Sequence, residues 1–204
     1  MSIYKKVLGT EFYRLHPMLQ KRYGFSNNKP FHATGVMKTI KKGPIFLYPI
    51  YWLGTKWKLL YPEHGSNIPF TILNTPKIGA NGEEQIHWER IFYFRSKKRY
   101  FNALMSFDAE RNLIKDYLGE PSVLYSDLAF TVSTNGELKI ESRKQRFVIG
   151  RFEFPLPRIF QGLATVTEKY IEDNEVFHVK VEVKNPMFGL IFMYEGEVSN
   201  NDLE

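Results

Sequence analysis

The chain has 204 residues, no cysteine, and 28 lysines and arginines against 22 aspartates and glutamates, which gives a formal net charge of +6. The lack of cysteine excludes a disulfide scaffold, a cysteine nucleophile and any cysteine-ligated metal site. Its 43% hydrophobic content argues against disorder, and the length is typical of a single domain over residues 1–204.

Positive charge is concentrated at the start of the chain. Residues 1–60 contain 11 lysines and arginines and one acid, Glu11, whereas residues 61–204 contain 17 bases and 21 acids. Such asymmetry indicates an anionic partner, although a plainer interpretation is that these lysines are solvated surface. Nucleic acid is not the expected partner, because the basic residues follow no recognisable nucleic-acid motif.

Residues 1–25 are predicted to form a helical segment made of short helices. Apolar residues recur at helical spacing from Ile3 to Leu19. Pro17 suits the first position of a helix, where its missing amide is not needed. The first ten residues lack the apolar core of a secretory signal peptide, so we expect a cytoplasmic protein.

The most apolar stretch, residues 44–53, is predicted to be a short helix or irregular segment, because Pro49 would damage a central strand. It is too short to cross a bilayer as a helix, which needs roughly 20 apolar residues. Lysines flank it on both sides, so we expect it to touch an anionic membrane surface or to guard the mouth of a cavity. The residues expected to make this contact are Ile45, Phe46, Leu47, Tyr51, Trp52, Lys56 and Lys58.

Residues 31–199 are predicted to form an antiparallel β domain. The clearest hairpin joins residues 85–95 to 99–107, and its first strand places Trp88, Arg90 and Phe92 on one face. Asn135-Gly136 predicts a second hairpin. Around ten strands joined by short turns predict a mainly β (α+β) fold, an antiparallel barrel or sandwich with short N-terminal helices.

Arg90 is the main candidate for binding a ligand inside this domain. It shares a strand face with Trp88, where a guanidinium can stack on aromatic rings while it pairs with a carboxylate. One interpretation is a structural arginine that closes one end of a barrel, and the other is a cation that holds an anionic headgroup. Arg99, Arg143 and Gln145 are candidates for the same patch, and Arg143 and Gln145 are predicted to share a face.

No motif assigns a catalytic, metal or cofactor site. The phosphate-binding, dinucleotide-binding, zinc-protease and nucleophile-elbow motifs are absent, and the five histidines are scattered. His178 with Glu182, and Glu195 with Glu197, share strand faces that are predicted to be solvated. We therefore predict no catalytic residue, no metal and no cofactor.

Four stretches together resemble an uncharacterised bacterial family, the domain of unknown function catalogued as number 4166. They are residues 8–23 (LGTEFYRLHPMLQKRY), Trp88-x-Arg90-x-Phe92, Leu118-Gly119 and Pro155-Leu156-Pro157. The resemblance covers nearly the whole chain and implies no particular activity. It also implies that members occur either alone or attached behind a nicotinamide-binding reductase-like domain, but no glycine fingerprint follows a strand in this sequence.

The sequence favours a non-catalytic carrier or sensor of an apolar or amphipathic anionic small molecule, enclosed by the barrel. Two alternatives stay open: an accessory or catalytic domain that acts on a small molecule, and a protein-interaction partner of a reductase. The sequence does not favour any oligomeric state.

Overall fold

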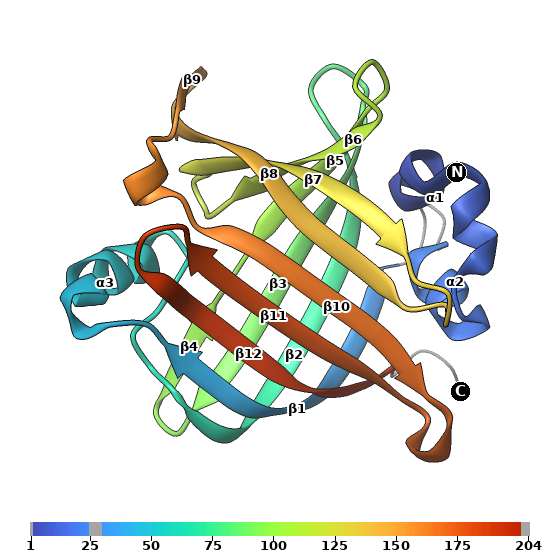
Figure 1. Cartoon of the computed structure of the whole chain (residues 1–204), viewed down its shortest axis with the longest axis horizontal. Coiled ribbons are helices and arrows are strands. Elements are labelled where there is room, and N and C mark those ends of the chain that lie inside the picture. The colour runs from blue at the N-terminus through green and yellow to red at the C-terminus, as the bar shows by residue number, and fades with distance from the viewer. Residues whose placement is uncertain (1, 25–29, 201–204) are drawn as a thin grey trace.

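The computed structural model describes residues 2–24 and 30–200 of the chain (Figure 1). Residues 1 and 25 of the predicted helical segment therefore lie outside the described residues. The helical elements are α1 (Ile3–Leu8), η1 (Gly9–Arg14), α2 (Pro17–Tyr23), η2 (Ile45–Leu47), α3 (Tyr48–Lys56), η3 (Arg158–Phe160) and η4 (Glu172–Asn174), where η marks a 3-10 helix. The strands are β1 (Phe31–Lys42), β2 (Gly65–Ile78), β3 (Glu84–Phe94), β4 (Lys97–Tyr100), β5 (Ala103–Asp108), β6 (Leu113–Leu118), β7 (Leu124–Val132), β8 (Leu138–Ile149), β9 (Phe152–Pro155), β10 (Leu163–Ile171), β11 (Val176–Asn185) and β12 (Gly189–Asn200).

Ten of the described strands close into an antiparallel barrel. Their hydrogen-bonded order is β10-β11-β12-β1-β2-β3-β5-β6-β7-β8, and β8 pairs back to β10, for example at Ile140↔Val166. Two short strands lie off this ring, where β4 pairs with β3 and β9 pairs with β8. The predicted mainly β fold is confirmed, and a barrel is the correct one of the two predicted architectures.

The alternation of side chains along each strand determines which residues face the barrel interior and which face outward. In β11, Phe177, Val179 and Val181 are buried in the core, while His178 and Lys180 between them lie on the outer wall. In β3, Trp88, Arg90 and Phe92 are buried on the inner face, as predicted. The barrel wall is therefore mainly apolar on its inner face, with a few charged residues such as Arg90, and charged on its outer face.

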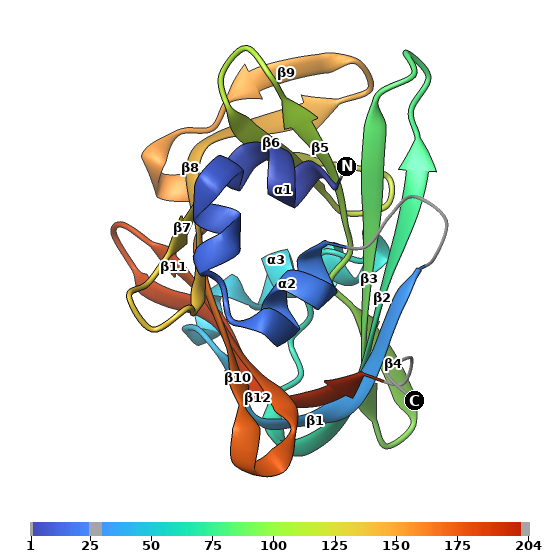
Figure 2. The same ribbon diagram turned by 90° about the vertical axis from the view of Figure 1, so that its right-hand side faces the viewer.

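The N-terminal helices cover one end of the barrel (Figure 2). His16 caps α2 by accepting a hydrogen bond from the Met18 amide at 3.3 Å, and Pro17 occupies the first turn, as predicted. The buried hydrophobic side chains of this segment join the main core, and they are Ile3, Tyr4, Leu8, Phe12, Leu15, Leu19 and Tyr23. This end of the barrel is consequently filled by side chains.

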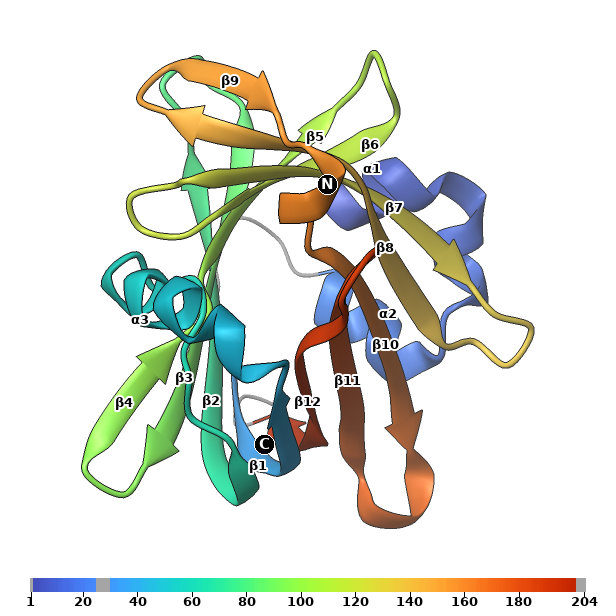
Figure 3. The same ribbon diagram turned by 60° about the vertical axis from the view of Figure 1, so that its left-hand side comes forward.

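The apolar stretch of residues 44–53 forms η2 and most of α3, as predicted, at the opposite end of the barrel (Figure 3). Pro49 lies in the first turn of α3, where no hydrogen bond from its nitrogen is required. The Tyr51 hydroxyl accepts a hydrogen bond from the Gly43 amide at 2.9 Å and donates one to the Ile191 carbonyl at 2.6 Å. None of the helices in the described ranges has the length and hydrophobicity to cross a membrane.

A β-bulge in β8 corrects one prediction of side-chain direction. Ser126 of β7 pairs with Gln145, but Leu128 pairs with Ser142, so β8 contains an extra residue between them. Gln145 and Ser142 are both buried, whereas Arg143 is exposed. The prediction that Arg143 and Gln145 share a face is wrong, because the bulge interrupts the alternation between them.

Candidate functional site

A cavity of about 760 Å³ occupies the barrel interior, and most of the side chains that line it are apolar. Its lining extends from Phe46 and Phe160 at the α3 end to Trp88 and Arg22 near the N-terminal helices. This volume lies within the range of roughly 300–1,000 Å³ that is common for small-molecule sites. Phe46 and Phe160 are exposed, whereas Trp88 and Arg22 are buried, so the α3 end is the mouth of the cavity and the N-terminal helices close its far end.

Arg90 brings a cation into this apolar space. Its guanidinium lies 4.2 Å from the centre of the Phe101 ring, and its Nη1 donates to the Tyr194 hydroxyl at 3.4 Å. Its Nε has no hydrogen-bond partner, and no carboxylate within the described ranges forms an ion pair with it. Arg90 can therefore donate hydrogen bonds to a molecule in the cavity.

Asp116 adds a buried carboxyl group to the same cavity. It faces inward from β6 and is paired in register with Ser126 of β7. In the described parts of the chain, Asp116 Oδ1 and the Ser126 hydroxyl both lack hydrogen-bond partners. Burial raises the pKa of Asp116 from 3.8 to about 7, although the positive charge of Arg90 acts in the opposite direction. Arg90, Asp116 and Ser126 thus offer hydrogen-bond donors and acceptors in a largely apolar enclosure.

A buried ion pair, formed by Arg22 and Glu168, lies at the closed end of the barrel. Arg22 Nη1 is 2.6 Å from Glu168 Oε1, and Tyr23 donates a 2.6 Å hydrogen bond to Glu168 Oε2. The Arg22 guanidinium lies over the rings of both Phe31 and Phe177, at 4.8 and 4.9 Å from their centres. Because Arg22 is ion-paired and packed on aromatic rings, the structural arginine that closes one end of the barrel is Arg22.

Three of the five predicted ligand residues line the cavity, namely Trp88, Arg90 and Gln145. The Gln145 amide bonds to both the amide and the carbonyl of Gly162, each at 2.9 Å, so its polar atoms position the start of β10. The other two are not lining residues: Arg99 is half-buried and donates to Glu63 at 2.7 Å, and Arg143 is exposed 3.7 Å from Glu141. The structure does not bring Arg99 and Arg143 to the cavity.

The predicted contact residues of the apolar stretch divide into two groups. Ile45, Phe46 and Trp52 are exposed, whereas Leu47 and Tyr51 are buried beneath them. Lys56 lies over the Trp52 ring at 4.4 Å, and Lys58 forms an ion pair with Glu120. Phe46, Leu47 and Tyr51 line the cavity, whereas the other four predicted residues lie outside its lining.

The Lys58 pair belongs to a cluster that holds the end of α3 against the wall. Glu120 also accepts a hydrogen bond from the Asn102 amide at 2.9 Å and pairs with His87. Burial by itself would raise the pKa of Glu120, but the hydrogen bonds from Lys58, Asn102 and His87 lower it to about 2. Glu120 is therefore ionised at neutral pH, and both of its carboxylate oxygens are hydrogen-bonded.

Sequence reasoning missed seven polar residues of the cavity lining: Arg22, Asp116, Ser126, Ser142, Glu168, Asn185 and Tyr194. A signal for two of them was present. Asp116 shares a strand face with Ile114 and Leu118, and Glu168 shares one with Val166 and Tyr170, so each acid lies on an apolar strand face. An acid at such a position indicates a buried carboxylate.

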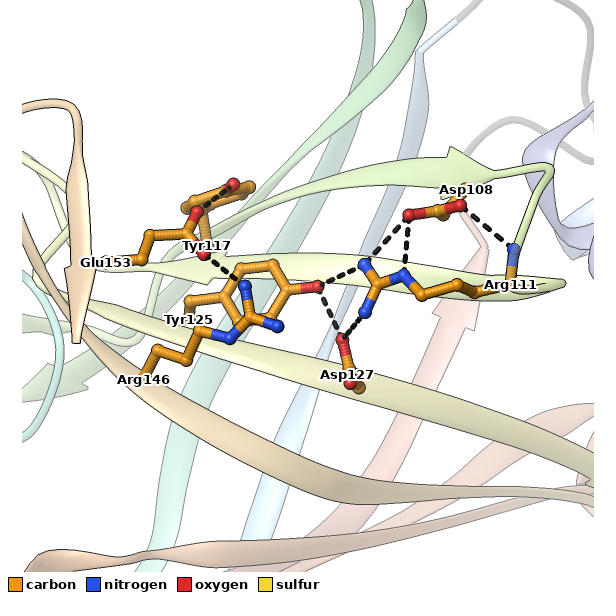
Figure 4. A network of polar contacts seen from close by, with 7 residues as sticks. All are labelled: Asp108, Arg111, Tyr117, Tyr125, Asp127, Arg146 and Glu153. Atoms are coloured by element: carbon orange, nitrogen blue, oxygen red, sulfur yellow. Dashed lines mark hydrogen bonds and ion pairs between the residues drawn. The ribbon is translucent and has the colours of Figure 1, made fainter. Parts of the chain in front are cut away.

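Several polar side chains on the outer wall form hydrogen bonds and ion pairs with one another (Figure 4). Arg111 donates to Asp108, to the Tyr125 hydroxyl at 2.9 Å and to Asp127 at 3.0 Å. His178, whose strand face is predicted from sequence to be solvated, pairs with Glu195 at 3.2 Å on the outer side of the barrel, away from the cavity. Within residues 2–24 and 30–200, no group of three acidic, histidine or cysteine side chains is arranged to hold a metal ion.

Two comparisons place the chain among known proteins. A family model described as "Domain of unknown function (DUF4166)" matches residues 15–198. The chain is also similar to the uncharacterized protein YndH of Bacillus subtilis (strain 168), with 36% identity over 203 residues that cover 100% of this chain and 98% of that protein. The family resemblance found in the sequence is thereby confirmed.

Proposed function

The chain belongs to the DUF4166 family, a domain of unknown function, and from its cavity we propose that it is a carrier of one amphipathic small molecule. The apolar part of the molecule fills the barrel, and its polar head contacts Arg90 and Asp116. The observation that carries this proposal is the cavity of about 760 Å³, which is largely apolar and has a few convergent polar groups.

The polar groups define the chemistry of the head. Arg90 Nε and Asp116 Oδ1 lack partners among the described side chains, and burying such atoms without a partner is costly. A carboxylate head accepts hydrogen bonds from Arg90, and protonated Asp116 donates to the same head. Because burial raises the pKa of Asp116 to about 7, this carboxyl group is partly protonated at neutral pH. An amphipathic carboxylic acid therefore fits both residues.

The experiment uses a fluorescent polyene fatty acid, cis-parinaric acid, whose emission rises in apolar surroundings. We expect saturable binding with one probe per chain. Ala164 lines the cavity, so Ala164→Trp fills part of it and weakens binding. Native mass spectrometry of the purified protein, followed by organic extraction, identifies any molecule bound in the cell.

Ala129→Trp is the matched control, because Ala129 lies on β7 beside the outer groove that contains Arg111 and Lys144. This variant must bind the probe like the wild type. If the wild type gives no saturable signal, or if both tryptophan variants bind equally well, the cavity is not the binding site and the proposal fails. Circular dichroism of each variant confirms that its fold is retained.

Asp116 favours a second candidate function, which is catalysis on the enclosed molecule. A buried carboxyl group with a pKa of about 7 is suited to proton transfer at neutral pH. Under this alternative, Asp116→Asn retains the ligand but leaves it chemically unchanged. Mass spectrometry of the extracted molecule before and after incubation with each protein separates a carrier from an enzyme.

A further inference from the structure

Exposed apolar side chains gather around the cavity mouth. Of the 17 large hydrophobic residues that are exposed in the described parts of the chain, 14 lie in three segments, and only Tyr13, Val36 and Ile78 lie elsewhere. We name these segments the rim, which consists of residues 41–58, 143–160 and 184–192. The 14 exposed residues are Ile45, Phe46, Tyr48, Ile50, Trp52, Leu53, Phe147, Ile149, Phe152, Phe154, Ile159, Phe160, Met187 and Phe188.

The three rim segments are adjacent in space. The Phe46 and Phe188 rings are 5.3 Å apart, which joins η2 to the turn between β11 and β12. Phe46, Phe154, Phe160 and Phe188 all line the cavity mouth. Figure 3 shows α3, β9 and the helical turn before β10 around this end of the barrel. Exposed apolar patches of this kind mark interaction surfaces.

The same segments carry an almost uniformly positive charge. They contain ten basic residues and a single acid, Glu153, which already pairs with Arg146 at 2.8 Å. The ten are Lys41, Lys42, Lys56, Lys58, Arg143, Lys144, Arg146, Arg151, Arg158 and Lys184. Two cations lie over exposed rim rings, Lys56 over Trp52 and Arg151 over Phe152. Apolar side chains surrounded by lysine and arginine are typical of proteins that lie on membrane surfaces.

We propose that the rim docks on an anionic phospholipid bilayer, with its apolar side chains inserted at the interface and its bases against the headgroups. The charge decides between this surface and a second copy of the chain, because two rims would bring like charges together. Of the ten rim bases, Lys58, Arg143 and Lys184 pair with acids outside the rim, and Arg146 pairs with Glu153. The other six, which are Lys41, Lys42, Lys56, Lys144, Arg151 and Arg158, form no ion pair within the described ranges. One end of the barrel therefore combines exposed apolar area with excess positive charge.

Docking in this orientation turns the cavity mouth toward the bilayer. An amphipathic molecule can then pass between membrane and barrel without exposing its apolar part to water. This last step rests on the proposed function, whereas the docking itself depends only on the rim.

Vesicle flotation of the full chain tests the docking. We expect the protein to float with vesicles of phosphatidylcholine and phosphatidylglycerol, to float less at high salt, and to stay in solution with phosphatidylcholine alone. Trp52 emission should shift to shorter wavelength on the anionic vesicles, and Trp52→Phe should remove that shift. A wild type that stays in solution with anionic vesicles overturns the proposal, as does a concentration-dependent dimer that buries the rim.

Paired variants assign the binding to the rim. Phe46→Ser with Phe160→Ser, and separately Lys56→Glu with Arg158→Glu, should each weaken vesicle binding by roughly tenfold or more. The matched controls are Val36→Ser with Ile78→Ser, and Lys21→Glu with Lys169→Glu at the closed end. Equal losses in rim and control variants contradict the proposal.

Binding of cis-parinaric acid, measured without vesicles, reports on the cavity alone. Docking that persists in a protein without probe binding leaves the inference standing and removes the proposed function. Probe binding without docking removes the docking inference and leaves the proposed function standing.

Discussion

Trp88 Nε1 donates a 2.6 Å hydrogen bond to the hydroxyl of Tyr4, so a strand of the barrel and the first N-terminal helix are joined inside the core. Both side chains are buried, and their rings lie edge to face with centres 6.4 Å apart. The tryptophan that contributes to the family resemblance thus has a structural partner 84 residues earlier in the chain.

Trp88→Phe should destabilise the fold by about 1–3 kcal/mol, because it leaves the Tyr4 hydroxyl without this donor and shrinks a packed ring. Urea unfolding followed by circular dichroism measures the change. Trp52→Phe is the matched control, because Trp52 is exposed, and its free energy of unfolding should stay close to that of the wild type. Equal stability of Trp88→Phe and wild type would contradict the role assigned to this bond.

Glu168→Gln should lower the free energy of unfolding by about 3–5 kcal/mol. Arg22 is then a buried charge without its counter-ion, and such an uncompensated charge is strongly destabilising. Replacing both residues, by Arg22→Met with Glu168→Met, should cost less than the single change, because no unpaired charge remains. Glu182→Gln on the outer wall removes only exposed ion pairs and should cost less than about 1 kcal/mol.

The local elements of this fold could be predicted from sequence, whereas the assembled interior could not. Alternation of Val179 and Val181 with Lys180, and the Asn135-Gly136 turn, are properties of neighbouring residues. The Arg22–Glu168 pair joins residues that are far apart in the chain, and barrel closure requires Ile140 of β8 to meet Val166 of β10.

The candidate site shows the same division. Alternation along the strands predicts Trp88, Arg90 and Gln145 as ligand residues, and all three line the cavity. The same alternation predicts Arg143 on the face of Gln145, but the bulge opposite Ser126 and Leu128 turns Arg143 outward. A bulge depends on pairing with a neighbouring strand, so the alternation along β8 alone does not show it.

Asp116 should make stability depend on pH. Its folded-state pKa, raised by burial to about 7, exceeds the ordinary value of 3.8, so between these values the folded protein holds a proton that the unfolded chain has lost. The free energy of unfolding should therefore fall as pH rises from about 4 to about 7, by up to about 1.4 kcal/mol per pH unit, and then level off. Urea unfolding at about pH 5 and about pH 7.5 measures it, and Asp116→Asn should reduce this dependence.

Arg90→Met should weaken the binding of cis-parinaric acid by roughly tenfold to a hundredfold, because a charge-assisted hydrogen bond contributes about 1.5–3 kcal/mol. The methyl ester of the probe carries no negative charge, so its affinity should change much less. Arg99→Met is the control, since Arg99 pairs with Glu63 outside the cavity. An Arg90→Met protein that binds the acid like the wild type would place the polar head elsewhere.

Glu153 fixes the position of β9, which carries the rim residues Phe152 and Phe154. Its carboxylate accepts hydrogen bonds from the Tyr117 hydroxyl at 2.6 Å and from Arg146 at 2.8 Å, so it ties β9 to β6 and β8 (Figure 4). Burial alone would raise the pKa of Glu153, but these two bonds lower it, so the carboxylate stays ionised at neutral pH.

Glu153→Gln should therefore loosen β9 without unfolding the barrel. A partly exposed pair contributes little to global stability, and we expect a loss of less than about 1 kcal/mol. Local opening is more sensitive, because β9 is a short strand that pairs only with β8 among the described strands. Hydrogen exchange measured by mass spectrometry should show faster exchange in residues 152–155 and unchanged exchange in β11. Faster exchange spread evenly over the barrel would mean that Glu153 supports the whole wall, and unchanged exchange in β9 would mean that its pairing with β8 is sufficient to hold it.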